Sequence, residues 1–147
     1  MENQENNQTT QMTSNIVITI SDDVQAKIDE LKEENFYEGD MIEFIQTYGN
    51  DAFLEYYEEY VQSGEDYSYE AVDAFVDEFG IECIAHFTDA YYGQYDSEEQ
   101  FAEQFVGDCY TSNLQDLPVV IDWTATWETN LRYDFSFVDG FVFNKNY

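Results

Sequence analysis

Rows of carboxylates recur along this chain at the spacing of one helical turn. Carboxylates at this spacing accept charge-assisted hydrogen bonds from Lys and Arg, and their Cβ atoms lie about 5 to 6 Å apart, on the scale of phosphate spacing along a nucleic-acid strand. The rows comprise Asp51, Glu55 and Glu59, then Glu70, Asp73 and Asp77, and then Glu98, Glu99 and Glu103. One acidic helix face is ordinary, but ordinary faces alternate acidic and basic residues. The pattern predicts a surface that binds the basic side chains of another protein.

The overall charge predicts the same kind of surface. The chain of 147 residues has 33 Asp and Glu, 4 Lys and Arg, and a formal net charge of −29. Duplex DNA carries one negative charge per about 1.7 Å of axis, so this charge equals that of roughly 14 base pairs. Repulsion excludes a nucleic-acid ligand, and a basic protein groove becomes the natural partner.

Catalytic and metal-binding chemistry has weaker support. Cys83 and His86 are spaced for one helix face, but a zinc site needs more ligands and no second pair of soft ligands follows, so we expect both to be buried structural residues. No Gly-x-Ser-x-Gly elbow accompanies His86, and no loop has the calcium-binding spacing. The segment from Asp29 to Lys32 superficially resembles a nuclease motif. The negative surface would, however, repel a nucleic-acid substrate. We predict a non-enzyme without cofactor or dedicated metal site.

The composition is that of a folded protein from a reducing compartment. Hydrophobic residues make up 44% and aromatic residues 18% of the chain, enough for a core. The two cysteines are not closely spaced, so we expect no disulfide framework. No apolar run is long enough to span a membrane, and the first fifteen residues lack the features of a signal peptide. We expect a cytoplasmic protein with no membrane contact. The thirteen tyrosines fit either the edge of a core or contacts for a partner's Arg.

A series of short elements is predicted to position the acidic rows. Residues 1–15 are polar and predict a disordered tail, and 16–39 predict a strand-helix unit: a strand over Asn15–Ile20, then a helix from the Ser21-Asp22 cap to about Glu34, ending at a break over Glu38–Asp40. Residues 40–88 predict an acidic helical region in which Gly49, Gly64 and Gly80 end helices. The apolar faces expected there are Phe53, Tyr56, Tyr57, Tyr60 and Val61, and then Val72, Phe75, Val76 and Phe79.

Residues 89–147 predict a mixture of helix and strand. A capping box at Ser97 and Gln100 begins one helix, and Asp122–Leu131 reads as another, while Val119–Trp123 fits either a strand or a helix entry. Tyr133–Val138 and Phe141–Phe143 predict a hairpin that turns at Asp139-Gly140. The predicted fold class is α+β, with a helical middle region and a C-terminal part that contains a β-hairpin.

Residues 90–147 resemble the antirestriction protein family called ArdA. The shared pattern is aromatic-x-Gly-x-aromatic-Asp-Ser-x-x-x-Phe-Ala, and it precedes an acidic helix. In this chain the pattern occupies Tyr91 to Ala102. The ending is similar as well, through Ile121-Asp122-Trp123, Trp127, Leu131, Tyr133-Asp134-Phe135 and the segment from Val138 to Phe143. This chain departs from the family at its front, where the usual larger N-terminal domain is reduced to about Asn15–Gly39.

The resemblance implies a non-catalytic DNA mimic from a phage or mobile element that blocks host type I restriction-modification enzymes, and a tendency to form elongated homodimers. It implies a mimic role for Asp96, Glu98, Glu99 and Glu103, and less directly for Asp122, Asp134 and Asp139, and a core role for Phe101, Phe105, Trp127, Phe135 and Phe143. Two other classes stay open: an acidic adaptor or inhibitor of another basic host protein, such as RNA polymerase or a CRISPR effector, and a calcium-responsive or enzymatic protein.

Overall fold

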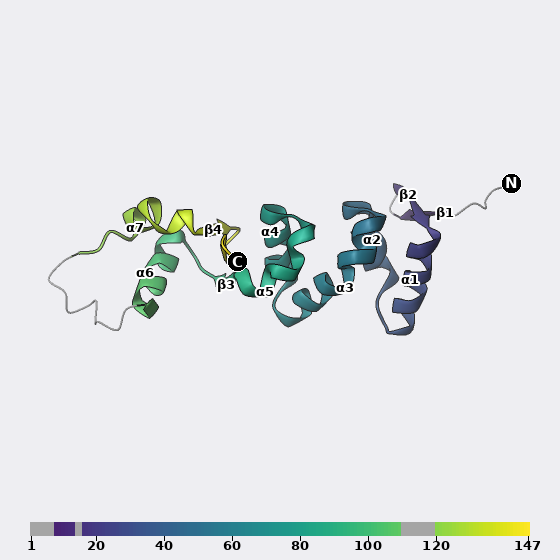
Figure 1. Cartoon of the computed structure of the whole chain (residues 1–147), viewed down its shortest axis with the longest axis horizontal. Helices are drawn as coiled ribbons and strands as arrows, with labels where there is room; N and C mark the ends of the chain where they lie inside the picture. The colour runs from purple at the N-terminus through teal and green to yellow at the C-terminus, as the bar shows by residue number, and fades with distance from the viewer. Residues whose placement is uncertain (1–7, 14–15, 110–119) are drawn as a thin grey trace. The chain divides into compact units, whose positions relative to one another are not determined.

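The computed structural model describes residues 8–13, 16–109 and 120–147 (Figure 1). The chain forms two compact units, Met1–Gln62 and Ser63–Tyr147, and the boundary between them falls inside one helix, α3. The segments predicted from the sequence end at residues 15, 39 and 88, and these bounds stay a prediction. The predicted α+β class, with a helical middle and a hairpin near the C-terminus, is confirmed.

The first unit is a hairpin followed by helices, and the second surrounds a small sheet with helices (Figure 1). The elements before the boundary are β1 (Gln8–Thr13), β2 (Ile16–Ser21), α1 (Asp22–Glu33), α2 (Glu38–Tyr48) and α3 (Asn50–Asp66), which continues across it. The remaining elements are α4 (Tyr69–Phe79), η1 (Ile81–His86), α5 (Phe87–Ala90), β3 (Tyr91–Gln94), α6 (Glu98–Cys109), α7 (Trp123–Thr129), η3 (Leu131–Tyr133), β4 (Phe135–Val138) and β5 (Phe141–Asn144).

The N-terminal hairpin corrects one prediction. The strand expected over Asn15–Ile20 is present as β2, and β1 pairs with it antiparallel from Thr13 opposite Ile16 to Gln8 opposite Ser21. The prediction of a disordered tail is therefore wrong for Gln8–Thr13. A strand ladder is made by backbone groups and does not require apolar residues, and the β-branched Thr residues of β1 favour extended backbone. Residues 1–7, 14 and 15 lie outside the described residues.

Helix α1 begins, packs and ends as predicted, since it runs to Glu33 with Glu34 as its C-cap. The Ser21 hydroxyl accepts a hydrogen bond from the backbone N–H of Val24 at 3.3 Å, and Val24, Ile28 and Leu31 are all buried. The break predicted at Glu38–Asp40 is wrong, because α2 already starts at Glu38. The chain instead reverses at Asn35, whose φ of 73° lies in the left-handed region that Asn tolerates better than most residues.

Aromatic rings fill the core of the first unit. Phe44 of α2 contacts Phe53, Tyr57 and Tyr60 of α3, with ring centroids 5.0 to 6.3 Å apart. Burial, with a smaller contribution from the charge of Asp40, raises the pKa of Tyr57 to about 12. The apolar face predicted for α3 therefore packs inward and leaves the opposite face to its carboxylates.

Two of the three glycines predicted to end helices do so. Gly49 and Gly80 follow α2 and α4, each with a φ of 99°, and their N–H groups donate to the carbonyls of Ile45 and Val76. The prediction for Gly64 is wrong, because this residue is buried inside α3. A Cβ at this position would collide with the ring of Tyr69, so Gly64 serves close packing and does not end the helix.

The sheet of the second unit is antiparallel, with strand order β3-β5-β4. The predicted hairpin turn is confirmed: Asp139 and Gly140 have φ values of 53° and 90°, and both must be positive in a type I′ turn. The helix predicted over Asp122–Leu131 is shorter, since α7 ends at Thr129 and η3 follows. Val120 and Ile121 form no strand and precede the α7 cap, and Val119 lies outside the described residues.

Successive side chains of β5 point to opposite faces of the sheet, and each face packs against helices. Phe143 contacts Phe75 of α4 and Phe87 of α5, with ring centroids 5.4 and 6.2 Å apart. Its neighbour Val142 belongs instead to a core cluster with Phe101 and Ala102 of α6, Trp127 of α7, Leu131 and Phe135. The sheet therefore lies between α4 and α5 on one face and α6 and α7 on the other.

Candidate protein-binding surface

Acidic side chains occupy the surface of both units. Except for the half-buried Glu38 and Glu98, every Asp and Glu within residues 16–109 and 120–147 is exposed. Carboxylates avoid burial unless a partner compensates the lost hydration, and this chain has few cations to supply one. No Lys or Arg lies anywhere between Lys32 and Arg132 in the sequence. The surface of α2 through α7 therefore carries one sign of charge.

The rows predicted on α3 and α4 are exposed on the side away from each helix's buried residues. Asp51, Glu55 and Glu59 of α3 lie opposite the buried Phe53 and Tyr57. On α4 the exposed residues are Glu70, Asp73 and Asp77, and the buried ones include Val72, Phe75 and Val76. The Ser68 hydroxyl caps α4 by accepting a hydrogen bond from the Ala71 N–H at 3.1 Å. Burial of one face of each helix thus fixes which carboxylates face solvent.

The start of α6 is fixed by two hydrogen bonds that involve Gln100. Its backbone N–H donates to the Ser97 hydroxyl at 3.0 Å, as a capping box requires, while its side-chain oxygen accepts from the N–H of Asp96 at 2.7 Å, one residue before the cap. Downstream, Glu99 and Glu103 are exposed as predicted. A hydrogen bond from its own backbone N–H, followed by one from the Thr124 hydroxyl at 2.8 Å, lowers the pKa of Glu99, which favours its ionised form.

Glu98 differs from the other predicted residues of α6. It is half-buried, and burial first, then the charges of Glu128 and Glu99, raises its pKa. A hydrogen bond with Trp127 acts in the opposite direction and favours the charged form. Glu98 therefore faces a pocket shared with α7, whereas Glu99 and Glu103 face solvent.

The C-terminal residues predicted as mimics are exposed and also have local structural roles. The Asp122 carboxylate caps α7 by accepting from the Ala125 N–H at 3.0 Å. Asp134 accepts a hydrogen bond from the Asn146 amide at 3.2 Å, and Asp139 occupies the hairpin turn. Local structure explains the presence of Asp122 and Asp139 without any partner.

The cations pair with carboxylates outside the predicted mimic set. Lys27 lies 2.9 Å from Glu58, which is the main cause of the raised pKa of this lysine. The other pairs are Lys27 with Glu30 at 3.5 Å, Lys32 with Glu38 at 3.1 Å and Arg132 with Glu128 at 3.0 Å. Lys145 donates to the backbone carbonyl of Arg132 at 2.9 Å. The carboxylates of these four ion pairs, Glu30, Glu38, Glu58 and Glu128, are not among the thirteen predicted mimic residues.

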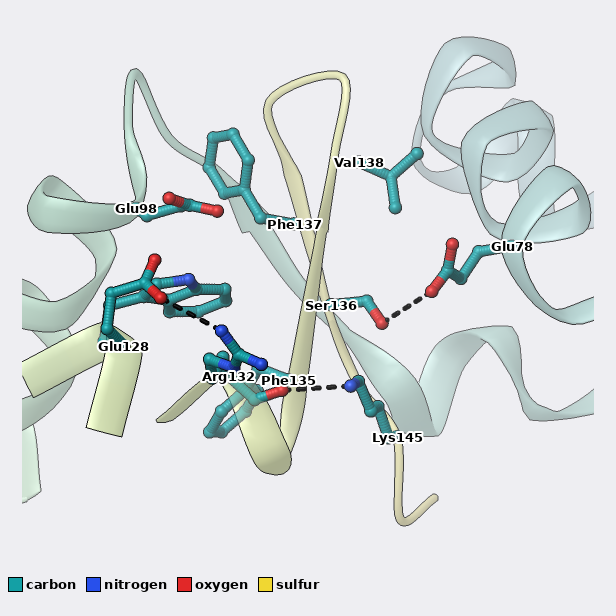
Figure 2. Close-up of a pocket in the computed structure, with 10 residues that line it drawn as sticks. Glu78, Glu98, Glu128, Arg132, Phe135, Ser136, Phe137, Val138 and Lys145 are labelled. Carbon is teal, nitrogen blue, oxygen red and sulfur yellow. Dashed lines mark hydrogen bonds and ion pairs between the residues drawn. The ribbon is translucent and has the colours of Figure 1, made fainter. Parts of the chain in front are cut away.

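A pocket of about 370 Å³ lies along β4 (Figure 2). It is lined by Glu78, Glu98, Trp127, Glu128, Arg132, Phe135, Ser136, Phe137, Val138 and Lys145. Both basic residues of the second unit are among these. Of the lining residues, the sequence predicted a binding role only for Glu98. The i,i+4 spacing of Glu128 and Arg132 could have indicated their ion pair, but no sequence signal joins Glu78 to Ser136.

No family model, curated protein sequence or solved structure matches the chain. The similarity to the ArdA family thus rests on the pattern from Tyr91 to Ala102 and on the C-terminal residues. Membership of that family stays a prediction.

Cys83 and His86 are placed differently from the prediction that both are buried. His86 is exposed and stacks on Tyr147, with ring centroids 4.7 Å apart, and Cys83 is half-buried beside the same tyrosine. Side chains three apart eclipse on a 3₁₀ helix, so both reach the same ring. Among the described residues, no three His, Cys, Asp or Glu side chains are grouped to hold a metal ion. No helix of the described segments combines the length and apolar character needed to cross a bilayer.

Proposed function

We propose that this chain is a DNA mimic that occupies the DNA-binding cleft of a host protein, with a type I restriction-modification enzyme as the first candidate. The observation that carries the proposal is the pair of exposed carboxylate rows on α3 and α4, within a stretch that contains no Lys or Arg. The ArdA resemblance of residues 90–147 supplies the class of target.

The charge arrangement supports mimicry because it opposes the stability of the chain's own helices. Like-charged residues one turn apart cost about 0.2 to 0.5 kcal/mol per pair, and a few Lys residues at these positions would remove the repulsion. Asp51, Glu55 and Glu59 accept this cost on one helix. A function that needs the negative potential itself accounts for the retention of such rows.

The mechanism is competition for the same basic residues. Carboxylates on α3, α4 and α6 take the positions of phosphates and accept charge-assisted hydrogen bonds from Arg and Lys in the cleft. Electrostatic attraction also accelerates the encounter, so binding weakens as salt screens the surface charge. The protein performs no covalent step in this mechanism, and it needs no cofactor.

A pull-down with a purified type I methyltransferase, with duplex DNA as competitor, tests this proposal. Mimicry predicts that the enzyme retains the chain and that the duplex displaces it. Retention that the duplex leaves unchanged would instead assign the chain to the class of acidic adaptors for other basic proteins, such as RNA polymerase or a CRISPR effector.

Two triple variants with the same net charge distinguish the contribution of the α4 row to binding from the effect of total charge. One carries Glu70→Gln, Asp73→Asn and Asp77→Asn, and the other neutralises three exposed carboxylates at the end of α1, Asp29→Asn, Glu33→Gln and Glu34→Gln. Both lose three negative charges. We expect the α4 variant to bind the methyltransferase at least about tenfold more weakly than the α1 variant, the equivalent of about 1.4 kcal/mol. Equal losses would contradict a specific role for the α4 row.

A further inference from the structure

Strand β4 is an outer strand of its sheet. The order β3-β5-β4 gives β4 one neighbour, and within the described residues no strand pairs with its other side. An outer strand presents backbone N–H and C=O groups that can pair with an additional strand. All four residues of β4 line the pocket of Figure 2, so this hollow runs along the free edge.

The hairpin register identifies which backbone groups face outward. In an antiparallel pair, alternate residues exchange hydrogen bonds with the neighbouring strand. The two-residue turn makes Val138 and Phe141 a bonded pair, so Ser136 bonds to β5 as well. Lys145 N donates to Asp134 O at 2.8 Å, as this alternation requires. The N–H and C=O groups of Phe135 and Phe137 therefore point away from β5.

Carboxylates flank this edge on both faces of the sheet. Figure 2 shows Glu78 on one side of the hairpin, next to Ser136, and on the other side Glu98 near Phe137 and Glu128 beside Arg132. Trp127 and Phe135 supply aromatic surface to the same pocket. The residues that line the edge thus offer main-chain hydrogen bonds, apolar contact and negative charge to one incoming segment.

We propose that an extended basic segment of another protein adds to this sheet as a strand beside β4. Successive side chains of a strand point to opposite faces, so one Arg or Lys of the segment reaches Glu78 and the next reaches Glu98 and Glu128. This site goes beyond DNA mimicry, because binding here depends on backbone pairing at β4 and on neither of the carboxylate rows of α3 and α4.

The resident cations do not block such a segment. Arg132 and Glu128 form an ion pair in which both side chains are about half exposed, at 50% and 51%, and pairs of this kind are weakly held. Lys145 donates to a backbone carbonyl, so Arg132 is the one cation of the pocket that forms an ion pair there. The pocket has three carboxylates, those of Glu78, Glu98 and Glu128. The raised pKa of Glu98, caused by burial and neighbouring carboxylates, also means that an added cation relieves an existing cost.

Titration of the ¹⁵N-labelled full chain with the peptide acetyl-Thr-Val-Arg-Arg-Val-Thr-amide, followed by NMR, tests the proposal. Two analogues carry N-methyl groups on alternate backbone nitrogens, one on the odd set and one on the even set, with unchanged charge. We expect the parent peptide to shift the amide signals of Phe135 and Phe137. One analogue should bind about tenfold or more weakly, because it loses main-chain hydrogen bonds to β4, while the other should bind like the parent.

Charge-matched variants complete the test. Glu98→Gln should weaken peptide binding several-fold, whereas Glu43→Gln, an exposed position on α2 of the other unit, should leave it unchanged. Three results would overturn the proposal: equal binding of the two N-methyl analogues, an equal loss of peptide affinity in both variants, or amide shifts confined to the acidic helices. Concentration-dependent self-association of the free chain that shifts the same β4 amides would assign the edge to a second copy and would also overturn it. None of these results depends on binding to the methyltransferase.

Discussion

The Ser136 hydroxyl of β4 donates a hydrogen bond to Glu78 Oε2 of α4 at 2.9 Å. Ser136 is only 5% exposed, and the two residues are 58 positions apart in the sequence. The bond ties the outer strand of the sheet to the helix that covers one of its faces. It also holds the Glu78 carboxylate beside the strand edge.

Replacement of Ser136 by Ala should destabilise the second unit by about 1 to 2 kcal/mol, because a partly buried hydrogen bond to a carboxylate is lost. Urea unfolding followed by tryptophan fluorescence measures this, since both tryptophans, Trp123 and Trp127, lie in this unit. Glu78→Gln should cost less, because the amide oxygen still accepts the bond. A Ser136→Ala variant as stable as the parent would show that the bond adds nothing.

Glu98→Gln should stabilise the second unit near neutral pH, and the gain should vanish in acid. Glu98 has a pKa raised above 4.5 by burial and by Glu128 and Glu99, so the folded state holds its proton more tightly than the unfolded state. Stability therefore falls as pH rises from about 4.5 through the folded-state pKa, and a neutral side chain escapes this loss. Urea midpoints between pH 4 and pH 8 measure the difference.

Glu103→Gln on the same helix provides the control for Glu98→Gln. Glu103 is exposed, and its neutralisation reports only the general relief of repulsion in a chain of net charge −29. Glu98→Gln should gain more than this control at pH 7 and no more than it at pH 4. Parallel pH profiles for the two variants would contradict the environment assigned to Glu98.

Two glycine substitutions should have opposite effects. Gly140→Ala should cost about 1 to 2 kcal/mol, because the φ of 90° is strained for Ala and the new Cβ would lie 3.3 Å from the Tyr95 carbonyl oxygen. Gly107→Ala on α6 should stabilise by about 0.5 to 1 kcal/mol, because a Cβ there meets no neighbour within 4 Å and Ala favours helix. Thermal unfolding of both variants checks the pair, and a loss at Gly107 would count against the α6 helix.

Phe101→Ala should destabilise the second unit by about 3 to 5 kcal/mol. Phe101 is 1% exposed and contacts Tyr95, Trp127 and Phe135 with ring centroids 5.0 to 6.1 Å apart. Truncation of this ring opens a cavity between the sheet and α6. Urea unfolding measures the loss, and a cost below about 1 kcal/mol would show that α6 does not pack as described.

Local signals in the sequence predicted several elements correctly. Ser21 and Ser68 cap helices because their hydroxyls satisfy free backbone N–H groups, and Asp139-Gly140 turns the hairpin because both residues tolerate positive φ. The carboxylate rows follow from helical periodicity, so Glu55 and Asp77 are exposed where the spacing placed them.

The features that the sequence did not predict depend on tertiary contacts. Gly64 could not be distinguished from a helix-ending glycine, because its role depends on the ring of Tyr69. Strand β3 is only four residues long and contains Gly93 at a register shift, so its pairing with β5 leaves no periodic pattern. The β4 pocket joins Glu78, Glu98 and Lys145 from distant segments.

An equilibrium competition titration tests the proposed DNA mimicry most directly. A fluorescent duplex is bound to a purified type I methyltransferase, and its apparent Kd is measured at increasing concentrations of this chain. Mimicry predicts that the apparent Kd rises linearly with chain concentration, without a plateau, and that the effect weakens as salt is raised. A plateau, with duplex and chain bound to the enzyme together, or an unchanged Kd would contradict it.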